Sequence, residues 1–328
     1  MSTITKAQDI SVKSILGEPE LLIEFLQNFI DIEILQDISP EDITDETERF
    51  LSILAEQKDG DTIKRINIKG DKPLFVITII EHESSVNFRA PFKLLYYIAM
   101  ILDAYEKEAN RKTENIGRTK DFKYPPILPI IFYDGAGEWT AAENLSQRTE
   151  MSDIFEKYIP HFEYELVCLN DYGVADLTKF ENLLSLFMII SKIKTATDFE
   201  IMKEVPKEYL QKLDSMNIPS HLKELLVNIT TVLLTKANVP KEEIRTITER
   251  LDERGISEMI LLEDYDVQAT RREARTEGQK EGRKEGRAEI IKPTVEFLLS
   301  QGKTITEVAA IIKVSEDEIT ELLPELAS

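Results

Sequence analysis

The fold of this chain is decided by residues 61–83, which read DTIKRINIKGDKPLFVITIIEHE. Residues 62–68 alternate in part between apolar and polar side chains, and Leu74–Ile80 is a nearly continuous run of β-branched and aromatic residues. Gly70 to Pro73 between them is typical of a turn. The stretch therefore predicts a β-hairpin whose second strand is buried on both faces of a sheet.

Acidic residues gather at one end of this hairpin. Asp61 opens the first strand, and Glu81, His82 and Glu83 close the second. The start of the first strand lies beside the end of the second, and side chains alternate along a strand, so Asp61 and Glu81 are expected close together, with Glu83 on the same side as Glu81. Carboxylates this close repel one another unless they bind a hard cation such as Mg²⁺, although strands also simply end in charged residues at a surface.

The segments around the hairpin predict an α/β domain with a mixed sheet. The first sixty residues have helical spacing, interrupted at Gly17–Pro19, and Arg89–Ala109 carries a broad apolar stripe typical of a helix. Pro125–Tyr133 and Phe162–Leu169 are expected to be further strands. The expected elements follow in the order helices, hairpin, helix, strand, helix and strand, and this order favours an α/β fold.

The second half of the chain is helical in pattern. The expected helices are Phe180–Lys194, Asp198–Leu213, Pro219–Ala237, Pro240–Arg254, Ile256 to about Glu289, Thr304–Ile312 and Ser315–Leu323. The last two resemble a helix-turn-helix, but Ser315 to Ala327 contains five acidic residues and no Lys or Arg. Such a helix would be repelled by phosphate, which favours a packing or partner-binding module.

The composition limits the class of protein. The 328 residues include 61 acidic and 40 basic ones, a net charge of −21 that argues against coating nucleic acid or an anionic membrane by bulk attraction. Cys168 is the single cysteine, so an internal disulfide and a thiolate-bound zinc site are excluded. No signal-peptide pattern is present, and the longest apolar runs fall far below the ~18 residues of a membrane span. We therefore expect a cytoplasmic protein without membrane contact.

One segment, residues 271–287, has a basic balance. Its seven cations are candidates for DNA contact: Arg271, Arg272, Arg275, Lys280, Arg283, Lys284 and Arg287. Gly278, Gly282 and Gly286 recur every fourth residue, and close approach of a second helix on that face would offset their helix-breaking cost. DNA tracking, dimerisation and a flexible linker remain three alternatives for this arm.

Three stretches in this order resemble the Rpn family of recombination-promoting nucleases, also called YhgA-like, of the PD-(D/E)XK superfamily. They are the hairpin with its Glu-His-Glu-Ser-Ser end, PFKLLYY at 91–97, and YPPILPIIFYDG at 124–135 with Trp139 just after it. The resemblance runs from about Asp9 to Leu177. It implies a restriction-endonuclease-like mixed sheet flanked by helices and followed by an all-α region.

The resemblance also implies a site. Asp61, Glu81 and the backbone carbonyl of His82 would hold Mg²⁺, and a water on the metal would attack a phosphodiester. The third motif position holds Glu83, where the family usually has Gln or Lys. Three outcomes are open: Glu83 is an extra metal ligand, Lys93 replaces the missing base, or the site is degenerate.

We therefore expect a metal-dependent DNA endonuclease, linked by resemblance to recombination or transposition. The alternative is a degenerate nuclease fold that acts as a DNA-binding or self-assembling module, with the helical arm joining copies of the chain. The expected division is a nuclease-like domain at 1–177, a helical region at 178–255, a long helix with the basic arm at 256–290, and a small helical module at 291–328.

Overall fold

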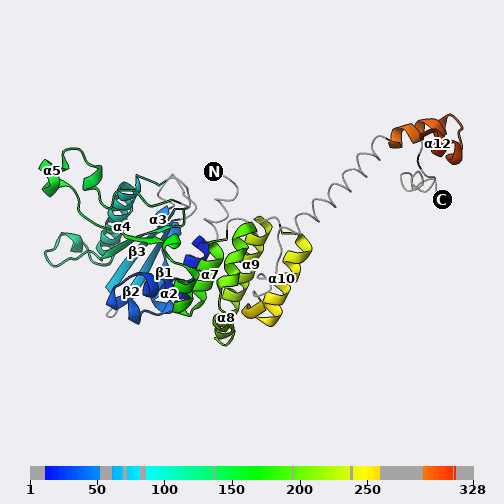
Figure 1. Cartoon of the computed structure of the whole chain (residues 1–328). Helices are drawn as coiled ribbons and strands as arrows, with labels where there is room; N and C mark the ends of the chain where they lie inside the picture. The colour runs from blue at the N-terminus through cyan, green and yellow to red at the C-terminus, as the bar shows by residue number, and fades with distance from the viewer. Residues whose placement is uncertain are drawn as a thin grey trace. The chain divides into compact units, whose positions relative to one another are not determined.

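The computed structural model describes residues 12–51, 61–68, 72–81, 86–135, 137–193, 196–236, 239–258, 291–312 and 314 (Figure 1). The chain divides into two compact units, residues 1–265 and 266–328. The expected boundaries at 177 and 255 both fall within the first unit, so the sheet and the helices that follow it belong to one compact body. The finer division of the chain stays a prediction.

The first unit contains a five-stranded mixed sheet in the order β1-β2-β3-β4-β5. The strands are β1 (Ile43–Asp45), β2 (Thr62–Ile68), β3 (Lys72–Glu81), β4 (Ile127–Tyr133) and β5 (Glu165–Cys168). The first three are antiparallel neighbours, and β3, β4 and β5 run parallel. The α/β class and the β2–β3 hairpin are thus confirmed, whereas the three-residue β1 was not expected because it is too short for a periodic pattern.

Helices cover both faces of this sheet (Figure 1). On one face, α4 (Ala90–Lys112) packs its apolar stripe over the central strands. The buried cluster there comprises Phe50, Ile63, Phe75, Ile77, Ala90, Leu94, Tyr97, Ile101 and Ile131. On the other face, Phe25 of α2 (Pro19–Phe29) meets Phe132 of β4 with ring centroids 6.1 Å apart.

The helical half of the unit begins with α7 (Leu183–Ser191), which is buried along its whole length. Its helices α9 (Ser220–Lys236) and α10 (Lys241–Arg254) match the expected segments. The single helix expected over Asp198–Leu213 was wrong in part, because a 3-10 helix, η8 (Ala196–Glu204), precedes α8 (Lys207–Asp214). Pro206 separates the two, since the residue before a proline is disfavoured in the α conformation.

Short elements connect these parts of the unit. They are a helix at 12–17, η1 (Glu33–Asp37), η2 (Pro40–Asp42), α3 (Thr47–Leu51), η3 (Ile116–Arg118), η4 (Ser146–Arg148), α5 (Ser152–Phe155), η5 (Glu156–Tyr158), η6 (Leu169–Asp171), α6 (Val174–Leu177) and η7 (Thr178–Phe180). None of the helices in the described ranges has both the length and the apolar character that a bilayer span requires.

The described part of the second unit is a pair of helices, residues 291–300 and α12 (Ile305–Ile312). Val295, Val308 and Ala309 form its buried core. Gly302 permits the turn between the helices with a φ of 82°, in the left-handed region that glycine favours. The basic arm at 271–287 and the expected helix Ser315–Leu323 lie outside the described residues.

Candidate functional site

The strand register places Asp61 at the edge of the sheet where β3 ends. Thr62 pairs with Thr78, so Asp61, one residue earlier, lies opposite position 79 of β3. Glu81 is two residues further along β3, at a position on the same face of the sheet. Such diagonal neighbours in an antiparallel pair have backbones about 7–8 Å apart, a separation that long acidic side chains can bridge.

Asp61 itself is buried and has two described partners on one oxygen. Its side chain is 1% exposed. Lys93 Nζ lies 2.6 Å from Asp61 Oδ2, and the hydroxyl of Tyr97 donates to the same oxygen at 2.6 Å. A carboxylate taken out of water needs this kind of compensation by a cation and a hydrogen bond. The result is a buried Asp61–Lys93–Tyr97 cluster beneath α4.

The packing of α4 determines which of its residues reach Asp61. Lys93 and Tyr97 are four residues apart and therefore share a face of the helix. Leu94 and Ile101, on the same half of the helix, are buried against the sheet and hold that half inward. Lys93 Nζ also lies 5.9 Å from the centroid of the Tyr97 ring, in cation–π range. Sequence reasoning identified Lys93 but missed Tyr97, whose signal was its i+4 spacing from that lysine.

The neighbouring end of β4 meets the same edge of the sheet. Tyr133 pairs with Glu81, and its buried ring packs on Trp139 at 5.2 Å between centroids. Burial raises the pKa of the Tyr133 hydroxyl. A Cβ on Gly135 would lie 2.2 Å from this hydroxyl, so the close approach of the ring requires glycine there.

Asp134 is the buried carboxylate that follows β4, and sequence reasoning did not select it as a site residue. Its loop is held by Asn170, whose side-chain amide donates to the carbonyl of Gly135 at 2.6 Å. The available signal was an aspartate directly after a buried parallel strand, because the carboxyl ends of β3 and β4 meet at one edge. Asp134 therefore belongs to the edge that carries Asp61 and Glu81.

Several expected site residues are not described at side-chain level. For Glu81 the structure gives the backbone position, and residues 82–85, with His82 and Glu83, lie outside the described residues. The seven cations of the arm also lie outside them. The roles assigned to these residues stay predictions.

Tertiary structure brings His221 to two glutamates that are far away in the sequence. Its Nε2 lies 3.6 Å from a carboxylate oxygen of Glu18 and 3.8 Å from one of Glu20. The sequence alone showed no metal-ligand spacing for this histidine. The three side chains are between 33% and 50% exposed, which is typical of a surface ion-pair cluster.

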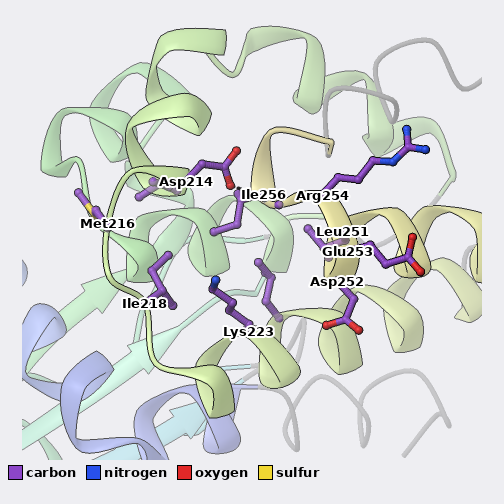
Figure 2. A pocket seen from close by; sticks show the side chains of 12 residues that line it. Asp214, Met216, Ile218, Lys223, Leu251, Asp252, Glu253, Arg254 and Ile256 are labelled. Carbon is purple, nitrogen blue, oxygen red and sulfur yellow. Dashed lines mark hydrogen bonds between the residues drawn. The ribbon is translucent and has the colours of Figure 1, made fainter.

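A cavity of about 250 Å³ lies far along the chain from Asp61, between α8, α9 and α10. Figure 2 shows Asp214 beside Ile256 in its wall. The Asp214 carboxylate accepts the backbone N–H groups of Ile256 at 2.5 Å and Ser257 at 2.9 Å. Gly255 has a φ of 113°, and a Cβ there would meet Asp214 at 2.6 Å. These contacts close the turn after α10 and have a structural role.

Comparison with known proteins places the chain in a family. Residues 6–221 match the model of the family described as "Putative transposase, YhgA-like". This match covers the sheet, the Asp61–Lys93–Tyr97 cluster and the helices through the start of α9. The chain therefore belongs to the YhgA-like family. It matches none of the curated proteins and none of the solved structures with which it was compared.

Proposed function

We propose that this chain is a metal-dependent DNA endonuclease of the PD-(D/E)XK type, whose active site is the sheet edge that carries Asp61 and Glu81. The observation that supports this most directly is the buried ion pair between Asp61 and Lys93. A carboxylate and an ammonium, adjacent to a further carboxylate position at a strand end, are the groups that phosphodiester hydrolysis needs. Membership of a transposase-like family supports DNA as the substrate.

The donor set suits a hard divalent cation. Asp61 and Glu81 would hold Mg²⁺ with the backbone carbonyl of His82, since Mg²⁺ prefers carboxylate and carbonyl oxygens. When bound, the ion would lower the pKa of a coordinated water and offset negative charge on the phosphate. Both described partners of Asp61 reach Oδ2, so we assign Oδ1 to the cation.

The chain's own residues would then divide the work. Tyr97 holds the Asp61 carboxylate in one orientation through its hydrogen bond. Lys93 is mostly buried beside it and would offset the charge that develops on the phosphate as water adds and the P–O bond to the leaving oxygen breaks. This assignment gives Lys93 the role of the lysine or glutamine that Glu83 replaces in the motif.

One observation favours the alternative of a catalytically degenerate fold. The Asp61 charge is already balanced by Lys93, so the carboxylate is stable without a metal. In that case the domain would serve as a DNA-binding or self-assembling module. The two proposed functions differ in whether Asp61 binds Mg²⁺.

Plasmid nicking by the purified full chain tests the proposal. We expect the wild type to nick supercoiled DNA with Mg²⁺ and not with EDTA, and we expect Asp61→Asn and Glu81→Gln to lose at least about a hundredfold in rate. Asp103→Asn is the matched control, because Asp103 is an exposed carboxylate of α4 paired with Lys107. Nicking that is absent in the wild type, or equal in all three variants, would refute the enzyme proposal.

A further inference from the structure

A row of exposed aromatic rings follows one side of α4. Phe88 just before the helix, then Phe92 and Tyr96, recur every fourth residue and are 48%, 54% and 51% exposed. Phe92 and Tyr96, four residues apart within α4, therefore lie above one another, about 6 Å apart along the axis, and Phe88 lies in the turn that leads into the helix. Large rings exposed in a continuous row are uncommon on a protein surface and indicate a binding function.

This aromatic row, defined as Phe88, Phe92 and Tyr96, borders the proposed active site. Phe92 and Tyr96 each immediately precede a residue that contacts Asp61, namely Lys93 and Tyr97. Successive helical residues are about 100° apart, so the row lies on the flank next to the face that covers the carboxylate. A ligand on the row would therefore lie beside the face of α4 that carries Lys93.

The charges around the row differ from those of the chain as a whole. The protein has a net charge of −21, yet residues 86–102 contain Arg89 and Lys93, the latter paired with Asp61, and no acidic residue. Arg148 of η4 adds a third cation, with its guanidinium 6.0 Å from the centroid of the Phe88 ring. Exposed aromatic faces interspersed with cations complement a ligand that has flat rings and negative charges.

We infer that the aromatic row is a stacking platform for unpaired bases, so that the DNA substrate presents a single-stranded segment at the site. This inference rests on the proposed function and specifies its substrate. Aromatic side chains beside a basic groove bind single strands because every base has a π-face, whereas the bases of an intact duplex are already stacked. Three rings in a row give room for successive bases along one strand.

A protein interface is the competing use of exposed aromatic rings, which are enriched in interface hot spots. The charge pattern favours nucleic acid, because a second copy of this acidic chain would be drawn to the cations alone, whereas a single strand satisfies the cations and the rings together. A protein partner is therefore treated as an outcome of the test.

The test measures binding in EDTA, so it does not depend on catalysis. Fluorescence anisotropy with the full chain would compare a labelled oligo-dT strand with a labelled duplex of the same length. We expect Phe92→Ala and Tyr96→Ala each to weaken single-strand binding about tenfold, which corresponds to about 1.4 kcal/mol, and to change duplex binding much less. Tyr96→Phe keeps the ring and should retain the wild-type affinity. Tyr158→Ala, at a still more exposed tyrosine on η5, is the control.

Three outcomes would overturn the inference. In the first, the wild-type protein fails to bind the single strand. In the second, the alanine variants bind it as tightly as the wild type does. In the third, the alanine variants change the oligomeric state in sedimentation, which would identify a protein interface. Each can be separated from failure of the proposed function, because plasmid nicking is measured independently. Nicking without single-strand binding would support the endonuclease and contradict the stacking platform.

Discussion

Lys93 Nζ lies 2.6 Å from Asp61 Oδ2, and the pair joins the start of β2 to the first turn of α4. Asp61 is buried and Lys93 is mostly buried, so each charge depends on the other for compensation. The same pair stands at the strand edge where a metal is expected. Its energetics therefore link the stability of the fold to the proposed chemistry.

Substitution of Lys93 by methionine should distinguish a metal-dependent endonuclease from a catalytically degenerate fold. The variant leaves Asp61 buried without its cation, and we expect a loss of about 3–5 kcal/mol in the free energy of unfolding without metal. If the site binds Mg²⁺, the ion should restore part of this loss and raise the melting temperature of Lys93→Met more than that of the wild type. Nicking should fall by about a hundredfold or more.

Lys107→Met is the matched control, because Lys107 is an exposed lysine of the same helix, paired with Asp103 at 2.7 Å. It should change stability by less than about 1 kcal/mol. Differential scanning fluorimetry with and without Mg²⁺ measures both variants. A Lys93→Met variant that gains nothing from Mg²⁺ would favour the degenerate fold.

Removal of the Tyr97 hydroxyl should weaken the Asp61 cluster. Tyr97→Phe deletes the donor to a buried charged acceptor, so we expect a loss of about 1.5–3 kcal/mol in unfolding free energy and slower nicking. In the Asp61→Asn background the same change should cost less, which a double-mutant cycle by urea denaturation would measure. Tyr105→Phe, eight residues beyond Tyr97 on α4, is the control. Additive costs in the cycle would contradict a direct interaction between Tyr97 and Asp61.

Gly135 should tolerate no side chain, because a Cβ would lie within 2.4 Å of three atoms of the Tyr133 ring and hydroxyl. We expect Gly135→Ala to destabilise the protein by about 1–3 kcal/mol through the forced shift of that buried ring. A Cβ on Gly137, two residues away, meets nothing within 4 Å. Gly137→Ala is therefore expected to be close to neutral in thermal unfolding. Equal melting temperatures for both variants would refute the steric argument.

Glu24 should make stability depend on pH. Burial raises the pKa of its carboxyl, which accepts the backbone N–H of Leu184 at 2.8 Å. The folded state therefore binds the proton more tightly than the unfolded state, so stability is greatest below the ordinary glutamate pKa and is lost as pH rises through the folded pKa. Glu24→Gln keeps an oxygen acceptor and removes this loss, so the variant should be more stable than the wild type at neutral pH.

Urea midpoints measured from acidic to neutral pH test this sign. The advantage of Glu24→Gln should disappear toward low pH, where the wild-type carboxyl is protonated. Glu41→Gln, at an exposed glutamate of η2, is the matched control. A variant that is less stable than the wild type at neutral pH would show that ionised Glu24 stabilises the fold.

The sequence by itself determined the hairpin, the α/β class and the edge at which Asp61 and Glu81 stand. These follow from local rules: alternation identifies a strand, a turn joins two strands, and antiparallel pairing then sets which residues share a face. Lys93 came from the family resemblance, as one possible replacement for the missing base, and the structure brings it to Asp61. Family resemblance at the hairpin agreed with the family found over residues 6–221.

Tertiary structure alone decided the partners of these residues. The hydroxyl of Tyr97 reaches Asp61 because the apolar face of α4 is buried on the sheet, and Tyr133 excludes a side chain at Gly135 because its ring is packed against Trp139. The apolar pattern of this segment predicts a helix, but it does not predict that Phe92 and Tyr96 are exposed. Periodicity along a chain records which face of an element is apolar, whereas contacts between residues far apart in sequence depend on how those faces pack.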